Sequence, residues 1–313
     1  EVQNGRLTGI ITDNAMDLID NIIPAPSRSS EIKALLMGQQ ACFDAGLTTV
    51  TDAGLDLSTI LLIDSLQKTG DLTIRVYAMA NPTVENFEYF KKNGPIANDK
   101  LQVSAFKLYA DGALGSRGAK LKQPYCDHAG HSGVWVTEPN QLVKLCQQVY
   151  DLNFQANTHC IGDSANKRVL EIYGEFLKGK NDKRWRIEHA QVVTPEDRAL
   201  FSKYSIIPSV QPTHATSDMR WADKRLCNTR MNGAYAYNSL LALNGWMPLG
   251  TDFPVEDISP FNTFFASVVR KDAKGFPENG FQIENALTRE QTLRGMTIWA
   301  AKANFEENEK GSI

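Results

Sequence analysis

Short apolar or β-branched runs alternate along this chain with longer stretches that have helical periodicity. The runs that we interpret as strands cover residues 48–53, 73–79, 103–110, 153–159, 185–189, 206–211 and 247–251. Amphipathic helices are expected between them, for example over residues 30–45, 58–68, 138–150, 164–177 and 195–204, and another over 289–301. Regular alternation of strands and helices predicts a parallel sheet.

The number of strand–helix units favours a barrel over a doubly wound sheet. No glycine-rich dinucleotide loop is present, because the glycines at 112, 115 and 118 do not have the G-x-G-x-x-G spacing. We therefore predict an α/β fold of the TIM-type (β/α)8 class, with residues 1–313 as one domain. Such a barrel needs eight strands, and the pattern supplies only seven.

Composition narrows the classes of partner. The chain has 313 residues, 42% of them hydrophobic, and a net charge of −3. This slight acidity gives no reason to expect nucleic acid, and no apolar run is long enough to span a membrane. Five scattered cysteines without a C-x-x-C pair favour free thiols and a reducing compartment. We expect a small-molecule partner; the compartment is left open, with the cytoplasm favoured.

Polar residues that could carry chemistry stand where the predicted strands end, the place where catalytic residues of such barrels lie. These residues are Asp52, Lys107, Asp111, His159, His189, His214 and Asp252. Lys107 lies between Phe106 and Leu108, and burying it is costly unless it has a partner or a task. Two histidines and an aspartate on one rim can hold a divalent cation and leave a position for water. From the residues alone, a metal site and satisfied core histidines remain equally open.

Several blocks of sequence occur together and in order. They are Lys107-Leu-Tyr-Ala-Asp-Gly-Ala-Leu-Gly-Ser-Arg117, His159-x-Ile-Gly-Asp163, Ile187-Glu-His-Ala190, Gln211-Pro-Thr-His214 and Gly250-Thr-Asp-Phe-Pro-Val255. The combination resembles the amidohydrolase superfamily, and within it the amidohydrolase-3 branch. That branch includes hydrolases like N-substituted formamide deformylase and like the exoenzyme regulatory protein.

The resemblance implies a metal-dependent hydrolase and a role for each site residue. Lys107 would react with carbon dioxide and, as N6-carboxylysine, bridge two metals. His159 and His189 would ligate one metal, and Asp252 would ligate the other and act as general base and acid. Asp111, Arg117 and His214 would contact substrate or orient the residues that do. Zinc fits these nitrogen and oxygen ligands, with one or two ions, and iron or manganese are alternatives.

One part of the family pattern is absent. No His-x-His pair, which supplies two ligands in the family, occurs in this sequence. We therefore expect strand one and the accessory β-sandwich of the family to lie outside this chain. The barrel domain in residues 1–313 would then be incomplete at both ends. Unpaired sheet edges would then favour a homo-oligomer.

We predict a hydrolase of carbon–nitrogen bonds other than peptide bonds, acting on an amide or cyclic amide through metal-activated water, and impaired in this chain alone. Two alternatives stay open. One is a Schiff-base aldolase that uses Lys107, which would trap with borohydride and need no metal. The other is a barrel fragment without catalytic activity, which would bind no metal.

Overall fold

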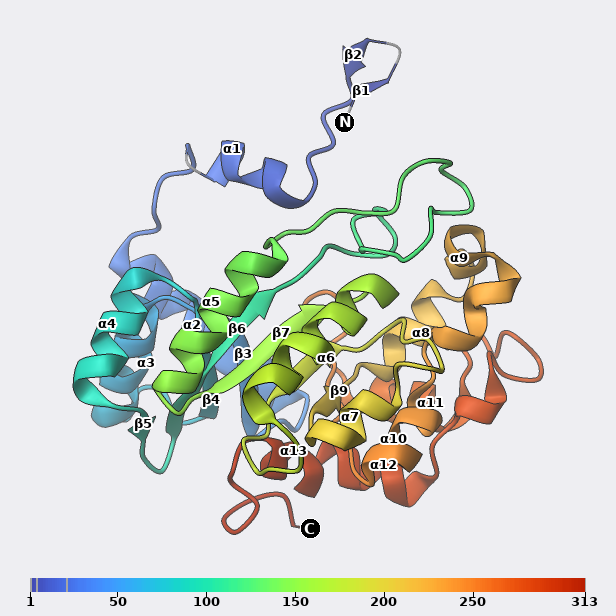
Figure 1. Cartoon of the computed structure of the whole chain (residues 1–313). Helices are drawn as coiled ribbons and strands as arrows, with labels where there is room; N and C mark the ends of the chain where they lie inside the picture. The colour runs from blue at the N-terminus through green and yellow to red at the C-terminus, as the bar shows by residue number, and fades with distance from the viewer. Residues whose placement is uncertain (1, 4, 21, 313) are drawn as a thin grey trace.

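A curved parallel sheet forms the centre of the computed structural model, which describes residues 2–3, 5–20 and 22–312 (Figure 1). Its parallel strands are β3 (Thr49–Leu55), β4 (Arg75–Ala80), β6 (Leu101–Tyr109), β7 (Gln155–Cys160), β8 (Arg186–His189) and β9 (Ile207–Ser209). They pair in chain order, each parallel to the next. Sequential order is that of a barrel, because a doubly wound sheet reverses its order at a switch point.

The predicted strands agree with this sheet except at its far end. The first six predicted strands are confirmed, each within a few residues. Residues 247–251 make only one parallel bridge, between Val210 and Leu249. At the other edge, no described residue pairs with the outer side of β3. The α/β class and the parallel sheet are thus confirmed, and the described residues form an open, curved sheet rather than a closed cylinder.

Smaller pieces of sheet lie at the margins. Strand β5 (Ile96–Ala97) adds to the start of β6 in the antiparallel sense. Strands β1 (Val2–Gln3) and β2 (Arg6–Leu7) make a separate antiparallel pair near the N-terminus, followed by α1 (Asp17–Asp20). In Figure 1 the β1–β2 pair lies apart from the body of the molecule, whereas Asn14, shortly before α1, donates a hydrogen bond to the carbonyl of Val136.

Helices pack around the sheet by burying one stripe of apolar side chains. In α5 (Pro139–Asp151) the buried residues are Leu142, Cys146 and Val149, which recur every three or four positions and so share one face. The other helices before β8 are α2 (Arg28–Asp44), α3 (Leu57–Thr69), α4 (Val84–Asn93) and α6 (Asp163–Leu177). None of the described helices has both the length and the apolar character needed to cross a membrane.

The C-terminal half contains shorter helices. They are α7 (Ala199–Tyr204), α8 (Pro212–Asp218), α9 (Ala222–Arg230), α10 (Tyr237–Asn244), α11 (Pro260–Val269), α12 (Arg289–Met296) and α13 (Ile298–Ala303), with 3-10 turns η1 (Asp13–Met16), η2 (Met231–Gly233) and η3 (Ile283–Asn285). The helix expected over 289–301 is divided at Thr297, whose φ of −125° and ψ of −96° are not helical. The helix expected over 195–204 begins four residues later, because residues 195–198 form a turn.

A long connection between β6 and α5 lies on the side to which β6 and β7 point, near α8 and α9 (Figure 1). A disulfide between Cys126 and Cys227 joins this connection to α9. The expectation of free cysteines is therefore wrong for this pair, whose members are 101 residues apart and meet only through the fold. It is confirmed for Cys42, Cys146 and Cys160, which are buried and free.

Asp111 ties the start of this connection to the loop after β7. Its carboxylate is fully buried and accepts hydrogen bonds from the backbone N–H groups of Lys120, Ile161 and Gly162, at 2.7–3.0 Å. Burial raises the pKa of Asp111 to about 7, and the three N–H donors partly oppose that rise. Sequence analysis had assigned Asp111 to substrate or to orienting the site; the contacts here are with backbone.

Replacing Asp111 by Ala should destabilise the chain, because three buried N–H groups would lose their acceptor. We expect a loss of about 3 kcal/mol or more in the free energy of unfolding, from the cost of unsatisfied buried donors. Urea unfolding measures it, with the exposed Asp99→Ala as control, expected to change stability by less than about 0.5 kcal/mol. Equal stability of the two variants would show that water replaces the carboxylate without cost.

Candidate active site

A cavity of about 430 Å³ opens at the carboxyl ends of the parallel strands. Lys107 of β6, His159 of β7 and His189 of β8 line it, together with His214 of α8 and with Asp252. The sheet register places these strand residues near the same edge, since Lys107 pairs with Asn157, two residues before His159, and His189 pairs with Cys160, the residue after His159. All four metal ligands predicted from the sequence therefore face one cavity.

Lys107 is held in an environment that disfavours its charge. Its side chain lies in the sheet with 4% of the residue exposed, and its Nζ is 4.8 Å from the centre of the Tyr109 ring. Burial lowers the pKa of the amine, and the carboxylates of Glu188 and Asp252 oppose this only in part. A neutral lysine amine is a nucleophile, whereas an ammonium is not.

His159 and His189 lie against each other, with ring centres 4.6 Å apart. Nδ1 of His189 is 2.7 Å from Oε1 of Gln211, and an amide oxygen only accepts, so Nδ1 carries the proton. Nε2 of His189 is then left with its lone pair, the tautomer that can bind a metal. Burial and the neighbouring His159 hold the pKa of His189 well below its usual range.

The ring of His159 has an unsatisfied nitrogen. Its Nε2 is buried without a hydrogen-bond partner among the described residues, and Oδ1 of Asp111 is 3.7 Å away. Burial and the charge of Lys107 lower the pKa of His159 to about 3, so the ring is neutral. A buried, unpaired nitrogen lone pair is the arrangement that a bound cation would satisfy.

Asp252 belongs to a chain of charged groups on the other side of the cavity. Nε2 of His214 lies 3.1 Å from Oδ2 of Asp252, and Nδ1 of His214 lies 3.1 Å from Oε1 of Glu256. Ser217 donates its hydroxyl to the same oxygen of Glu256 at 2.6 Å. The imidazole of His214 is thus held between two carboxylates.

These hydrogen bonds decide the charges of Asp252, His214 and Glu256. Burial alone would lower the pKa of His214, but the bonds to Asp252 and Glu256 outweigh it and raise the pKa to about 9. In turn, burial would raise the pKa of Asp252, and His214 with His189 lowers it below 3.8. At neutral pH an imidazolium therefore stands between two ionised carboxylates.

Two of the site residues have strained backbones. His189 has a φ of 74° and Asp252 a φ of 60°, in the left-handed region that non-glycine residues seldom adopt. Such strain persists only where the surrounding structure enforces it, and it is typical of functional sites. Both residues turn their side chains into the cavity at the point where an extended segment ends.

One subset of the lining residues forms a compact set of donor atoms. A nitrogen of His189, a nitrogen of His214 and an oxygen of Asp252 all lie within 4.8 Å of one another. Because His214 is protonated and both of its ring nitrogens are engaged, the atoms that fit a divalent cation such as zinc are those of His189 and Asp252, together with the unpaired Nε2 of His159. Which of these atoms bind a cation remains a prediction.

The structure separates Arg117 from the predicted site. Arg117 is not among the residues that line the cavity, and its guanidinium pairs with Asp127 at 2.9 and 3.1 Å in the connection after β6. Arg225 of α9 also pairs with Asp127. Arg117 therefore helps to hold the connection against α9, and a contact with substrate remains a prediction.

Glu256 is a site residue that the sequence analysis missed. Its backbone N–H lies 3.4 Å from the carbonyl of Asp252 in a turn, which brings the two carboxylates to the same side. An acid four residues after a candidate ligand, within one turn, was the available signal. Asp218 and Trp221 also line the cavity and were not assigned a role.

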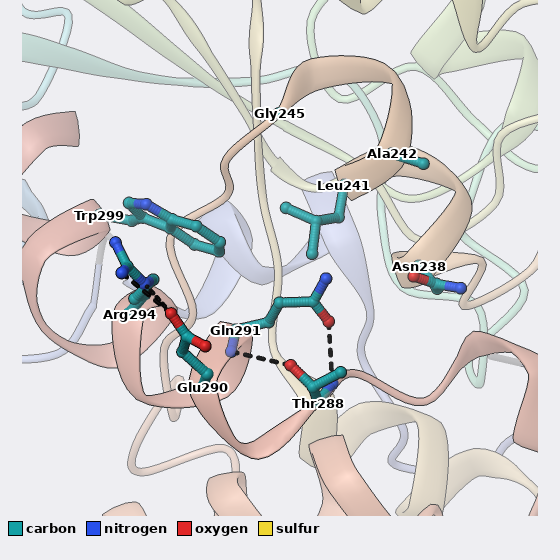
Figure 2. Close-up of a pocket in the computed structure, with 9 residues that line it drawn as sticks. All are labelled: Asn238, Leu241, Ala242, Gly245, Thr288, Glu290, Gln291, Arg294 and Trp299. Atoms are coloured by element: carbon teal, nitrogen blue, oxygen red, sulfur yellow. Dashed lines mark hydrogen bonds and ion pairs between the residues drawn. The ribbon is translucent and has the colours of Figure 1, made fainter.

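A second hollow, of about 490 Å³, lies between α10 and α12 with Trp299 at its side (Figure 2). Its polar side chains are already paired: Arg294 with Glu290 at 2.9 Å, and Thr288 with Gln291 in a capping box. No histidine, lysine or cysteine lines it. The chemistry therefore belongs to the smaller cavity at the strand ends.

Comparison with known proteins points to one family. The family model described as "Amidohydrolase family" matches residues 1–313. The chain is 28% identical to "Putative amidohydrolase YtcJ" of Bacillus subtilis over 317 residues, 99% of this chain and 59% of that protein. It is 27% identical to "Protein LONG AFTER FAR-RED 3" of Arabidopsis thaliana over 325 residues, 99% of this chain and 55% of that protein.

A solved structure shares the fold. The crystal structure of an uncharacterized metal-dependent hydrolase from Pyrococcus horikoshii OT3 superposes with a TM-score of 0.83 at 24% identity, over 95% of this chain and 59% of that one. The chain thus spans a little more than half the length of the relatives that it matches.

The charged state of His214 predicts a dependence of stability on pH. Its pKa is about 9 in the folded chain against 6.5 as the reference value. The contribution of His214 to the free energy of unfolding is therefore complete below pH 6.5 and is lost as pH rises towards 9. The variant His214→Gln should lack this decline in the free energy of unfolding. The decline in the wild type is at most about 3 kcal/mol, because each unit of pKa difference is worth about 1.4 kcal/mol.

Urea unfolding of chelator-treated wild type and variant across this pH range measures the difference. His128→Gln, in the exposed part of the connection after β6, controls for loss of a histidine. Parallel pH profiles for wild type and His214→Gln would contradict the assigned charge.

Proposed function

The chain belongs to the amidohydrolase family of metal-dependent hydrolases, and from this premise we propose that it hydrolyses a carbon–nitrogen bond of a small amide or cyclic amide, other than a peptide bond. One observation carries the proposal. A buried lysine, two neutral histidines and an ionised aspartate, from separate elements, face one cavity at the carboxyl ends of the strands. Within this proposal the curved sheet is the main part of a TIM-type barrel.

Lys107, His159, His189 and Asp252 would hold the cation, which we propose to be zinc because nitrogen and oxygen donors suit it. A bound divalent cation lowers the pKa of water and polarises the scissile carbonyl. Both imidazoles are kept neutral by burial, as metal ligands must be. His189 is oriented for this by Gln211.

Lys107 would enter the ligand set as a carbamate. A bond would form between the neutral Nζ and the carbon of carbon dioxide as one carbon–oxygen π bond opens, and the nitrogen would release one proton to solvent. The side chain then carries a negative charge and two oxygen donors. Burial supports the first step, because it lowers the pKa of the amine and so supplies the neutral nucleophile.

Asp252 would move the proton of the reaction. It starts ionised, as a base must, and one of its oxygens is held by His214. The other oxygen takes a proton from the attacking water. When the carbon–nitrogen bond breaks, the same proton passes to the leaving nitrogen, so that no net proton remains on the enzyme. Glu256 keeps His214 in place during both transfers.

The donors available here amount to one cation site. No His-x-His pair occurs in the sequence, so the second site of the family would lack its usual ligands. We therefore expect one cation per chain and weak hydrolysis by this chain itself. The alternative of a barrel without activity predicts no cation, and a Schiff-base aldolase predicts borohydride trapping of Lys107 without metal dependence.

Zinc binding tests the proposal. Chelator-treated chain, supplied with bicarbonate, is titrated with zinc by calorimetry, and metal-loaded chain is assayed against a panel of simple N-acyl amines. We expect one zinc per chain, and binding weaker by ~100-fold or more in His159→Asn or His189→Asn, since loss of an outer partner alone costs ~10–100-fold. Hydrolysis should disappear with chelator and return with zinc.

The exposed loop variant His128→Asn is the matched control and should bind zinc like wild type. Zinc affinity unchanged in both site variants would overturn the ligand assignment. Hydrolysis that persists in chelator would overturn the metal-dependent reaction.

A further inference from the structure

Asp218, the last residue of α8, lines the cavity and has no part in the proposed reaction. Its Oδ2 accepts hydrogen bonds from the hydroxyl of Tyr235 at 2.7 Å and from Nε2 of Gln191 at 3.1 Å. Nε2 of Gln191 also lies 3.1 Å from the Tyr235 oxygen, so the three groups form a closed triangle. Tyr235 and Gln191 are buried, which fixes the carboxylate in place.

The charge of Asp218 is not balanced by a cationic partner of its own. Its hydrogen-bond donors, Tyr235, Gln191 and Ser217, are all neutral. In the described part of the chain no lysine or arginine forms an ion pair with it, and the neighbouring Arg220 pairs with Asp272 instead. The nearest cationic influence is His214, whose two ring nitrogens are already engaged by Asp252 and Glu256. A buried carboxylate with no cation within hydrogen-bond distance is costly unless a ligand supplies one.

The remaining walls are apolar. Leu114 and Ile161 are buried beneath the cavity surface, and Trp221 and Val255 line it from the α8–α9 side and from the mouth. Gly115 allows close packing of the connection against Trp221, because a Cβ there would lie 3.2 Å from the indole ring. A cavity of this volume holds a ring-sized apolar body together with a few polar groups.

We propose that the natural substrate carries an ammonium or amidinium group on an apolar body, and that Asp218 binds this group while the scissile bond lies at the Asp252 end. That the molecule bound here is a substrate rests on the proposed function. A charge-assisted hydrogen bond to a carboxylate shielded from water is strong enough to decide between a cationic and a neutral ligand. An anionic ligand would meet both Asp218 and Asp252 and be disfavoured.

Three probes of the same shape test the preference: 3-phenylpropylamine, which is protonated at neutral pH, 3-phenyl-1-propanol and 3-phenylpropionate. Binding to the zinc-loaded and the chelator-treated chain is measured by calorimetry. We expect the amine to bind ~10-fold or more tighter than the alcohol, from the strength of a charged hydrogen bond. The carboxylate should bind most weakly to the chelator-treated chain, where no zinc can attract it. Equal affinities, or no saturable binding of the amine, would overturn the proposal.

The variant Asp218→Asn removes the charge and keeps a group that Tyr235 and Gln191 can still contact. It should bind amine and alcohol equally. Asp223→Asn, on the exposed surface of α9, removes the same charge away from the cavity and should keep the wild-type preference. If Asp218→Asn still prefers the amine over the alcohol, the ammonium group binds elsewhere, for example at Asp252, and the proposal is wrong.

Folding of Asp218→Asn is checked by its thermal unfolding. If it does not fold, Tyr235→Phe serves instead: it keeps the charge, so it must retain the amine preference, and loss of that preference with an intact fold contradicts the role of the charge. The outcome is separable from the proposed reaction, because binding is read without hydrolysis. If the chain prefers the amine in an Asp218-dependent way but never hydrolyses an amide, the proposed function is wrong and the proposal that Asp218 binds an ammonium group is kept.

Discussion

Burial of ionisable side chains at the carboxyl ends of the strands is the constraint on which the rest of this site depends. Burial there lowers the pKa of Lys107 and keeps the imidazoles of His159 and His189 neutral. Neutral amine and imidazole nitrogens have lone pairs to offer, and His159 has one that no protein group satisfies. The same desolvation that makes these residues costly to bury also favours the forms that the proposed ligands and nucleophile need.

On the opposite side of the cavity, buried ionisable groups are stabilised by pairing with opposite charges. Asp252, His214 and Glu256 remain ionised because they alternate in sign and hydrogen-bond to one another. The cavity is therefore divided into a half that donates lone pairs and a half that can hold and transfer a proton. Hydrolysis of an amide needs both, since water must be activated and the leaving nitrogen must be protonated. The left-handed backbone at His189 and Asp252 indicates that the fold accepts local strain to bring the halves together.

Much of this arrangement could be predicted from sequence, and the limits have physical reasons. Lys107, His159, His189 and Asp252 each follow an apolar run, and parallel strands carry their ends to one edge, so their meeting was predictable. Glu256 and Asp218 belong to a turn and a short helix, where no periodicity marks the inner side. The Cys126–Cys227 disulfide and the backbone contacts of Asp111 join segments distant in sequence, which only packing brings together. Residues 247–251 have a strand-like composition but make a single bridge.

The sheet and the connections contribute different parts of the cavity. Lys107, His159 and His189 stand on strands near their carboxyl ends, and the ladder of backbone hydrogen bonds sets their positions. Leu114, Trp221 and Asp218 stand on the connection after β6 and on the α8–α9 region, which the disulfide and Asp127 hold together. Substitutions there would change the shape and charge of the cavity without disturbing the sheet register. In the proposed function, the strands therefore position the candidate ligands of the cation, whereas the disulfide-linked connection and the α8–α9 region shape the part of the cavity that would select the substrate.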